Sequence, residues 1–391
     1  MEVTFMENKK VRLAVLGNGP RGMGLAGVYA THPSVEVVAV CDIADDYANN
    51  TANHIQNMVG YTPKAFKRYE DLAKGSCYDA IMIAVDPDIQ VDYAVREMER
   101  GIHVMTEVPA AYTIDQCYAL VNAVRKTGCK YQLAEQTRYW SFIAKWRDMA
   151  ERGEFGKIYY AEGEYLHYDP QWDYFRNKKT GHHVWTCDPA YDQNPDYERT
   201  WRYYTFGNPI FYLPHELSPL LSITGGRIES VSCLGTEKGG SHTKGFDVRD
   251  LECALMQNSN GSIFSLRAGF NAPYGHKRET GTHWYQIKGT EKTVEWARSE
   301  LDMPKEFIPG QGWINHEDWG CADPDAEEMF RNATHGGADM YPIHYFVDAI
   351  LNDKTPPMDV YRAVETAAPA ILAAKSAEMG GIKLDVPDFR A

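Results

Sequence analysis

The segment 11–22, VRLAVLGNGPRG, limits the fold of this chain more than any other stretch. An apolar run leads into three glycines with the spacing G-x-G-x-x-G, at Gly17, Gly19 and Gly22, and a helical pattern follows. Glycine permits a tight turn and lets backbone amides approach a phosphate at the N-terminus of a helix. A strand, a glycine turn and a helix in this order predict the first unit of a doubly wound α/β sheet.

The second apolar run, 35–42, ends at Asp42, twenty residues beyond Gly22. A carboxylate at this place accepts hydrogen bonds from a ribose diol and repels a 2′-phosphate, which predicts NAD rather than NADP. Further apolar runs at 78–85, 103–108 and 131–136 alternate with helical patterns, as in a parallel sheet covered by helices. Ligands of such sheets bind at the carboxyl ends of the strands. We therefore predict a cofactor site that contains Gly17, Asn18, Gly19, Pro20, Arg21, Gly22, Asp42, Val85, Glu107 and Pro109.

From about Lys157 the pattern changes to longer alternating strands, which predict a large, mostly antiparallel sheet. Asn260 and Gly261 form a hairpin signal between two such strands, and helical patterns lie at 215–226, 341–353 and 360–381. We expect an NAD-binding α/β Rossmann domain over 1–135 and a substrate-binding α+β domain over 136–391. The C-terminal helices are expected to pack back on the first domain. The segment 169–202 lacks any period and predicts a long loop over the site.

The charge and the cysteines exclude several kinds of partner. A net charge of -14 disfavours nucleic acid and anionic membranes, which proteins bind chiefly through lysine and arginine. The eight cysteines are dispersed without a CxxC, so we expect reduced thiols rather than disulfides or a metal site. The first ten residues are too polar for a signal peptide, and no apolar run approaches the roughly 18 residues that span a bilayer. A cytoplasmic protein with a small-molecule substrate is the expectation.

Together these features resemble the glucose–fructose oxidoreductase, inositol dehydrogenase and rhizopine-catabolism (Gfo/Idh/MocA) family, over nearly the whole chain. The strand that ends in Glu107-Val108-Pro109 carries part of the resemblance. In the sugar dehydrogenases of that family the turn reads Glu-Lys-Pro, and the lysine assists proton transfer at the hydroxyl that is oxidised. Because Val108 replaces the lysine, we expect the proton-transfer groups to lie in the other domain.

The segment 207–221, GNPIFYLPHELSPLL, supplies candidates for these groups. Tyr212 and His215 are three positions apart and point to one side of a helix start. The segment is similar to the Tyr-Pro-x-His stretch of the NAD-dependent α-N-acetylgalactosaminidases of glycoside hydrolase family 109, with Pro214 displaced by one residue. Further residues match in the same order. The resemblance implies His215, Tyr212, Tyr165 and His167 as catalytic residues, and Glu135, Arg202, Tyr274 and His335 as sugar-binding residues.

The resemblance also implies a reaction. NAD⁺ takes hydride from ring carbon C3, a base removes the acidified proton at C2, the aglycone leaves C1, water adds, and the hydride returns. His215 and Tyr212 are the candidates for the C3 hydroxyl proton, and Tyr165, backed by His167, is the candidate for C2. The alternatives are an NAD-dependent sugar or cyclitol dehydrogenase, a ketosugar lyase, and a nucleotide-binding regulatory protein without turnover. The sequence leaves the sugar open between an N-acetylhexosamine, a neutral hexose and an anionic sugar such as sulfoquinovose, and the resemblance implies a homodimer or homotetramer.

Overall fold

The first domain is a six-stranded parallel sheet with the order β3-β2-β1-β4-β5-β6. The computed structural model describes residues 10–168, 175–186, 188–205, 207–239, 247–271, 273, 275–276 and 279–391. In the order of the sheet, the strands are β3 (Lys64–Phe66), β2 (Val35–Cys41), β1 (Val11–Leu16), β4 (Ala80–Ile83), β5 (His103–Thr106) and β6 (Tyr131–Leu133). The strand order reverses between β1 and β4, and ligands of open α/β sheets bind at such a switch point.

Five helices cover this sheet: α1 (Pro20–Thr31), α2 (Asp45–Val59), α3 (Tyr69–Gly75), α4 (Pro87–Glu99) and α5 (Ile114–Thr127). The predicted α/β fold is confirmed. The start and the end of α5 have the expected residues. Thr113 forms a capping box with Gln116, and Gly128 ends the helix with a φ of 69°. The sequence missed β3, which is three residues long with one buried side chain.

The second domain contains a nine-stranded sheet, in which every neighbouring pair is antiparallel except β7 and β13. In the order of the sheet, its strands are β17 (Gly312–Asn315), β16 (Lys305–Ile308), β15 (Thr293–Glu295), β14 (His283–Gly289), β7 (Ile158–Leu166), β13 (Ile263–Gly269), β12 (Glu252–Asn258), β11 (Ile228–Gly235) and β18 (Leu384–Asp385). Buried and exposed residues alternate strictly along β12, so one face of the sheet is covered. The predicted mostly antiparallel sheet is confirmed, and Gly261 has the positive φ, 88°, that the hairpin turn requires.

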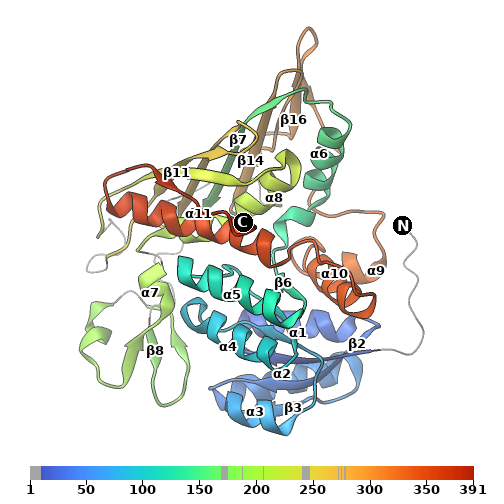
Figure 1. Cartoon of the computed structure of the whole chain (residues 1–391), viewed down its shortest axis with the longest axis vertical. Coiled ribbons are helices and arrows are strands. Elements are labelled where there is room, and N and C mark those ends of the chain that lie inside the picture. The colour runs from blue at the N-terminus through green and yellow to red at the C-terminus, as the bar shows by residue number, and fades with distance from the viewer. Residues whose placement is uncertain are drawn as a thin grey trace.

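The helices outside the first domain pack around the large sheet or against the first domain. α6 (Ser141–Glu151), α8 (Pro214–Thr224) and α11 (Val360–Glu378) pack around the large sheet, and α11 also runs along α5 of the first domain (Figure 1). α10 (Met340–Leu351), which follows the short α9 (Glu328–Arg331), contacts β1, β6 and α1. The C-terminal helices therefore tie the two domains together, while the exact boundary near residue 135 stays a prediction.

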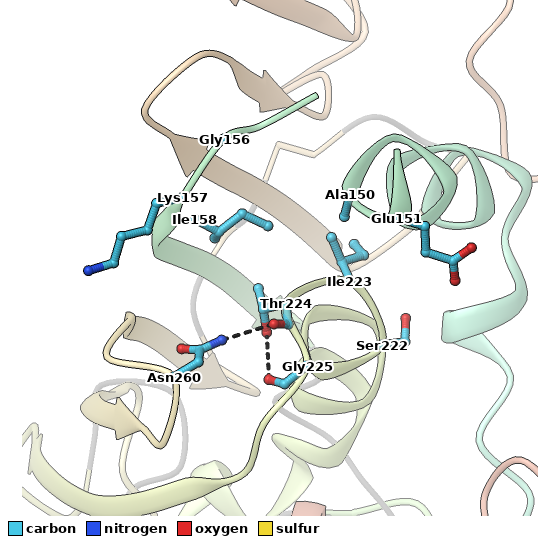
Figure 2. A pocket seen from close by; sticks show the side chains of 10 residues that line it. All are labelled: Ala150, Glu151, Gly156, Lys157, Ile158, Ser222, Ile223, Thr224, Gly225 and Asn260. Atoms are coloured by element: carbon cyan, nitrogen blue, oxygen red, sulfur yellow. Dashed lines mark hydrogen bonds between the residues drawn. The ribbon is translucent and has the colours of Figure 1, made fainter. Parts of the chain in front are cut away.

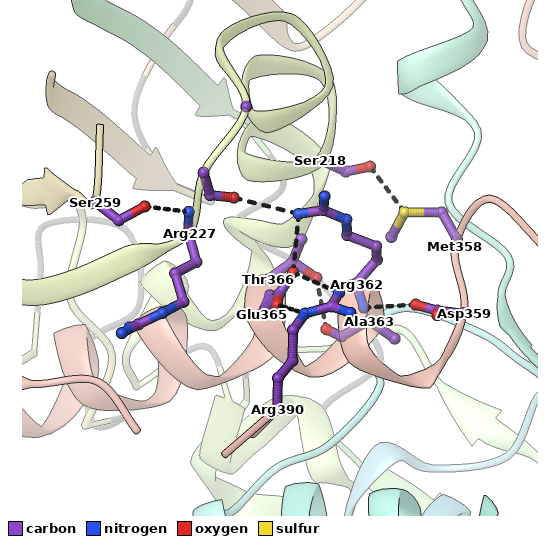
Figure 3. Close-up of polar contacts among 12 residues, drawn as sticks. Ser218, Arg227, Ser259, Met358, Asp359, Arg362, Ala363, Glu365, Thr366 and Arg390 are labelled. Carbon is purple, nitrogen blue, oxygen red and sulfur yellow. Dashed lines mark hydrogen bonds and ion pairs between the residues drawn. The ribbon is translucent and has the colours of Figure 1, made fainter. Parts of the chain in front are cut away.

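A polar cluster fixes α11 to its surroundings, as Figure 3 shows. Asp359 caps the helix by accepting a hydrogen bond from the Arg362 amide at 2.9 Å. The side chain of Glu365 accepts from Arg362 at 3.0 Å and from Arg390 at 2.7 Å, so the chain end is fastened to the helix. Because Glu365 is buried, these two charges compensate its desolvation.

The segment predicted as a long loop has its own secondary structure, so that prediction is wrong for the described residues. β8 (Phe175–Asn177), β9 (His183–Val184) and β10 (Tyr197–Arg199) form a small antiparallel sheet with the order β10-β8-β9. The short helix α7 (Trp201–Thr205) and two 3-10 turns, Pro189–Gln193 and Pro209–Tyr212, complete the region. Phe175 is fully buried in the main core, which anchors the small sheet. The strands are too short to show a period in the sequence.

The search for membrane-spanning helices found none of sufficient length and apolarity in the part of the chain that the structure describes.

Candidate active site

The turn after β1 has the shape that a dinucleotide site needs. A Cβ on Gly17 would overlap the carbonyl oxygen of Ala84, and a Cβ on Gly22 would overlap the carbonyl oxygen of Gly17. Around Gly19, by contrast, no atom lies within 4 Å of the position that a Cβ would take. Two glycines are thus needed for close backbone packing, and the third leaves open space at the N-terminus of α1, where a phosphate binds.

Asp42 joins the ends of β1 and β2. One of its carboxylate oxygens accepts a hydrogen bond from the Asn18 amide at 2.5 Å, and the other accepts from the Ala44 amide at 2.9 Å. Burial raises the pKa of Asp42, and the two amide donors oppose that rise. Asn18 donates to the Cys41 carbonyl at 2.8 Å, and its Oδ1 has no hydrogen-bond partner among the described residues. A buried acceptor of this kind fits a ligand with hydroxyl or amide donors.

Arg21 connects the glycine turn to both domains instead of lying free in solvent. Its Nε donates to Glu107 at 2.8 Å, and its two terminal nitrogens donate to Asp339 at 3.0 and 2.9 Å. Asp339 also accepts from Thr334 and lies 2.8 Å from Nδ1 of His335. Burial alone would raise the pKa of Asp339, but the charges of Arg21 and His335 outweigh it and hold that pKa well below its usual range.

The four predicted catalytic residues lie in one aromatic cluster. Tyr165 on β7 is stacked on Tyr212 with a centroid distance of 5.7 Å, and the His215 ring lies 5.2 Å from Tyr165. His167 meets the edge of Tyr165 at 4.7 Å. Tyr165, Tyr212 and His215 are all buried. The structure therefore brings Tyr165 of β7 together with Tyr212 and His215 at the start of α8, which follow it by 47 and 50 positions in the sequence.

Glu135 lies behind this cluster, directly after β6, and is fully buried. Its Oε1 accepts hydrogen bonds from the amide and the hydroxyl of Thr137 at 2.8 and 2.6 Å. Its Oε2 lies 2.8 Å from Nδ1 of His215, within ion-pair distance, although the two groups do not align as a hydrogen bond. The oxygen of the Thr137 hydroxyl also lies 2.7 Å from the His215 carbonyl oxygen, an alternative acceptor for its one proton, so the segment after β6 contacts the start of α8.

Sequence reasoning missed a second pair of an acid and a histidine beside the first. Nδ1 of His283 lies 2.6 Å from Oε1 of Glu216, and the His283 ring lies 4.8 Å from Tyr165. Burial and the charge of Glu135 raise the pKa of Glu216 well above its usual range, while burial and the charge of His215 lower the pKa of His283. His283 pairs with Tyr165 across β14 and β7, and only this strand register reveals its place.

The other predicted site residues occupy different surroundings. Arg202 on α7 lies over the Trp201 ring at 4.6 Å, and its charge opposes the rise in the pKa of Tyr165 that burial causes. His335 is part of the Arg21 and Asp339 network, with a φ of 54°, and its carbonyl accepts from Trp140. Val85 follows β4 beside Gly17, and the carbonyls of Glu107 and Pro109 both accept from Gln90. Tyr274 lies outside the described residues.

These groups permit acid–base chemistry. Two buried histidines, each with a glutamate at Nδ1, and two stacked tyrosines offer several proton donors and acceptors within one cluster. Trp140 links this cluster to the network of Arg21, Asp339 and His335, because its indole donates to the His335 carbonyl at 3.1 Å and its ring lies 5.2 Å from that of His283.

An open surface pocket elsewhere contains none of the predicted site residues (Figure 2). It lies where the end of α6, the start of β7 and the end of α8 meet, and Asn260 donates to the Thr224 carbonyl across it. Glu151 and Lys157 are its charged lining residues, and they form no pair with each other that would suggest a catalytic role.

Comparison with protein-family models gives two matches. A model described as "Oxidoreductase family, NAD-binding Rossmann fold" (GFO_IDH_MocA) matches residues 11–135. A second, described as "Oxidoreductase family, C-terminal alpha/beta domain" (GFO_IDH_MocA_C), matches residues 147–386. The two matches cover most of the chain and include both sheets.

Similar proteins agree with these matches. A "Glycosyl hydrolase family 109 protein" of Parabacteroides distasonis is 25% identical over 420 residues, which cover 98% of this chain and 87% of that protein. An "Alpha-N-acetylgalactosaminidase" of Tannerella forsythia is 26% identical over 396 residues, which cover 90% of this chain and 81% of that protein.

Among solved structures, the myo-inositol 2-dehydrogenase of Lactobacillus plantarum has a TM-score of 0.71 at 17% identity, covering 97% of this chain and 100% of that one. An oxidoreductase of Agrobacterium radiobacter, solved with NAD⁺, L-tartaric acid and magnesium, has a TM-score of 0.72 at 12% identity, covering 96% and 98%. At such identities the structures support the fold.

Proposed function

Because the chain belongs to the Gfo/Idh/MocA oxidoreductase family and has its NAD-binding Rossmann domain, we propose that it is an NAD-dependent glycosidase. The proposed reaction is cleavage of a glycosidic bond by transient oxidation at C3, elimination across C1 and C2, addition of water, and reduction. The observation that carries the proposal is the joining of Tyr165, Tyr212 and His215 in one buried cluster, while Val108 stands where related dehydrogenases use lysine.

The residues that would hold the cofactor are those of the glycine turn, with Asp42 toward the ribose and Glu107 at the end of β5. Bound NAD⁺ would supply the redox chemistry, since it accepts hydride from a ring carbon and can return it in the same cycle. Asp42 favours a free 2′-hydroxyl over a 2′-phosphate, because its carboxylate accepts hydrogen bonds and repels a second negative charge.

His215 is proposed to exchange the proton of the C3 hydroxyl. Its Nδ1 faces Glu135, so Nε2 is the ring nitrogen available to the substrate. Glu135 would orient the ring and stabilise its protonated form, as a carboxylate does behind a general-base histidine. Thr137 holds Glu135 in place through two hydrogen bonds. Tyr212, stacked beside Tyr165, would donate to the same hydroxyl.

Tyr165 is proposed to exchange the proton at C2, which becomes acidic once C3 is a ketone. Burial raises the pKa of Tyr165 well above its ordinary value, and nearby Tyr212 raises it further. The phenol is therefore neutral until a neighbouring imidazole accepts its proton. His167, His215 and His283 all have ring centroids within about 5 Å of Tyr165, at 4.7, 5.2 and 4.8 Å. The C2 proton and the proton for the leaving group would pass through this cluster.

An N-acetyl-α-galactosaminide is the first substrate to test, since a relative of 26% identity carries the name alpha-N-acetylgalactosaminidase. Neutral and anionic glycosides follow, because the sugar contacts include Arg202, whose charge suits a carboxylate or a sulfonate. A cytoplasmic location and assembly into dimers or tetramers also remain predictions.

The test is cleavage of aryl glycosides by protein stripped of nucleotide. p-Nitrophenyl α-N-acetylgalactosaminide, its β-anomer, and neutral and anionic analogues are incubated with and without added NAD⁺. The proposal expects nitrophenol release only with NAD⁺, at catalytic amounts of nucleotide and without net NADH. Equal release by the stripped protein contradicts it. Steady NADH formation from a free sugar, with no nitrophenol release from any glycoside, indicates a sugar or cyclitol dehydrogenase instead.

A further inference from the structure

The small sheet formed by β8, β9 and β10 reaches across to the first domain at the end of β2. Nε2 of His182 lies 2.7 Å from Oδ1 of Asp46, at the start of α2. The His182 ring is also stacked on Tyr47, with a centroid distance of 5.1 Å and an interplanar angle of 16°. Gly181 approaches so closely that a Cβ on it would lie 3.2 Å from the Ala44 amide nitrogen. One segment thus packs on the residues that directly follow Asp42.

The same small sheet makes a second contact with the first domain, at the end of β4. Arg176 on β8 forms an ion pair with Asp86 at 3.2 Å, and Asp86 is the N-cap of α4. The side chains of Arg176 and Asp86 are mostly covered, with exposed fractions of 22% and 16%. Arg176 also pairs with Glu198 on β10, so the contact is supported from within the small sheet.

The two contacts lie on either side of the glycine turn. In the parallel sheet β1 lies between β2 and β4, and the contacts are made at the carboxyl ends of β2 and β4. The turn Gly17–Gly19 follows the carboxyl end of β1, so it lies between the two points of attachment. A segment attached on both sides of this turn borders the place where the dinucleotide enters.

We propose that the small sheet β8–β10 forms an outer wall of the dinucleotide site and slows the exchange of NAD. The contact between His182 and Asp46, called the latch below, holds this wall against the first domain. An enzyme that restores its cofactor in every cycle gains from retaining it, whereas an ordinary dehydrogenase must release it. The inference rests on the binding of NAD and on the contacts of the small sheet, not on the sugar chemistry, so it can fail while the proposed glycosidase activity holds, and the reverse.

The experiment measures the release of NAD from the full-length protein, without any sugar. Protein loaded with radiolabelled NAD⁺ is mixed with an excess of unlabelled NAD⁺, and the label that stays bound is followed over time by rapid filtration. The variants are Asp46→Asn, His182→Ala and the double variant. Asp192→Asn is the matched control, because it makes the same chemical change in an ion pair, Asp192 with Arg199 at 2.6 Å, within the small sheet region.

If the latch slows exchange, NAD should leave the variants faster than it leaves the parent protein. Asp46→Asn weakens one exposed ion pair and accelerates release about two- to fivefold, and His182→Ala also loses the ring stacking and accelerates it about tenfold. The double variant matches His182→Ala, because both substitutions break one contact. Removing the negative charge of Asp46 would by itself strengthen the binding of an anionic cofactor and slow its release. Faster release from Asp46→Asn therefore reports the loss of the latch and not the change in charge.

Unchanged release in either latch variant overturns the inference, as does an equal acceleration in Asp192→Asn. Additive effects in the double variant overturn the claim that the two residues act as one latch. Thermal unfolding of each variant accompanies the measurement, and His182 and Asp46 are both half exposed, so the variants retain the fold.

Discussion

Gly22→Ala tests whether close backbone packing shapes the dinucleotide turn. A Cβ at residue 22 would overlap the carbonyl oxygen of Gly17 and lie 2.9 Å from its carbonyl carbon. Both atoms belong to the backbone, so no side chain can move aside and the turn itself must shift. Overpacking of this kind costs about 1–3 kcal/mol. Because the turn must keep its shape to bind a pyrophosphate, the affinity for NAD should fall about 5- to 150-fold.

The same helix supplies the control. Gly24 is exposed, and nothing lies within 4 Å of the position that its Cβ would take. Gly24→Ala should therefore raise the free energy of unfolding by about 0.5–1 kcal/mol through helix propensity and leave NAD binding unchanged. Calorimetric titration with NAD⁺ and thermal unfolding of both variants provide the comparison. If Gly22→Ala binds NAD as tightly as Gly24→Ala, the reasoning about the turn is wrong.

Three further predictions concern the proton-transfer cluster and the network that joins the domains. His215→Ala should lower glycoside cleavage about 10²- to 10⁴-fold without weakening NAD binding, as measured by nitrophenol release and by titration. Tyr165→Phe keeps the stacked ring but removes the hydroxyl, so cleavage should fall about 10²-fold or more in the same assay while thermal stability is retained; normal turnover would remove Tyr165 from the mechanism. Asp339→Asn breaks a buried ion pair and should lower the free energy of unfolding by about 3 kcal/mol in denaturant titrations at neutral pH. The pKa of Asp339 is depressed in the folded chain, so its contribution is complete above the unfolded value of about 3.9 and declines progressively as the pH falls from there toward the folded value; the difference between parent and variant should shrink over that range.

Much of the fold is contained in local sequence patterns. Five of the six parallel strands are apolar runs followed by a turn, and helices such as α5 carry a cap at Thr113 and a terminating glycine at Gly128. The alternation along β12 identifies a sheet with one covered face. Short elements are different, because β3, β8 and β9 have two or three residues each and owe their conformation to neighbouring chain segments rather than to a period.

The site residues also divide into those that a local sequence pattern places and those that only the folded chain places. Residues next to a motif, such as Gly17 and Asp42, could be placed from the sequence, since the strand and the turn fix their positions. Tyr165, Tyr212 and His215 came from a family resemblance, and the structure joins them. His283 could not be found, because its place depends on the pairing of β14 with β7, which no local pattern encodes. The network of Arg21 with Asp339 likewise joins residues 318 positions apart.

The measurement that tests the central claim most directly is the isotope content of the sugar released in deuterated water. A p-nitrophenyl glycoside that the protein cleaves is turned over to completion, and the product is analysed by NMR. Elimination followed by water addition predicts one solvent-derived deuterium at C2 and none at C3, because the hydrogen at C3 returns from the cofactor as the hydride that was taken from the same sugar. A product without deuterium at C2 would contradict the account.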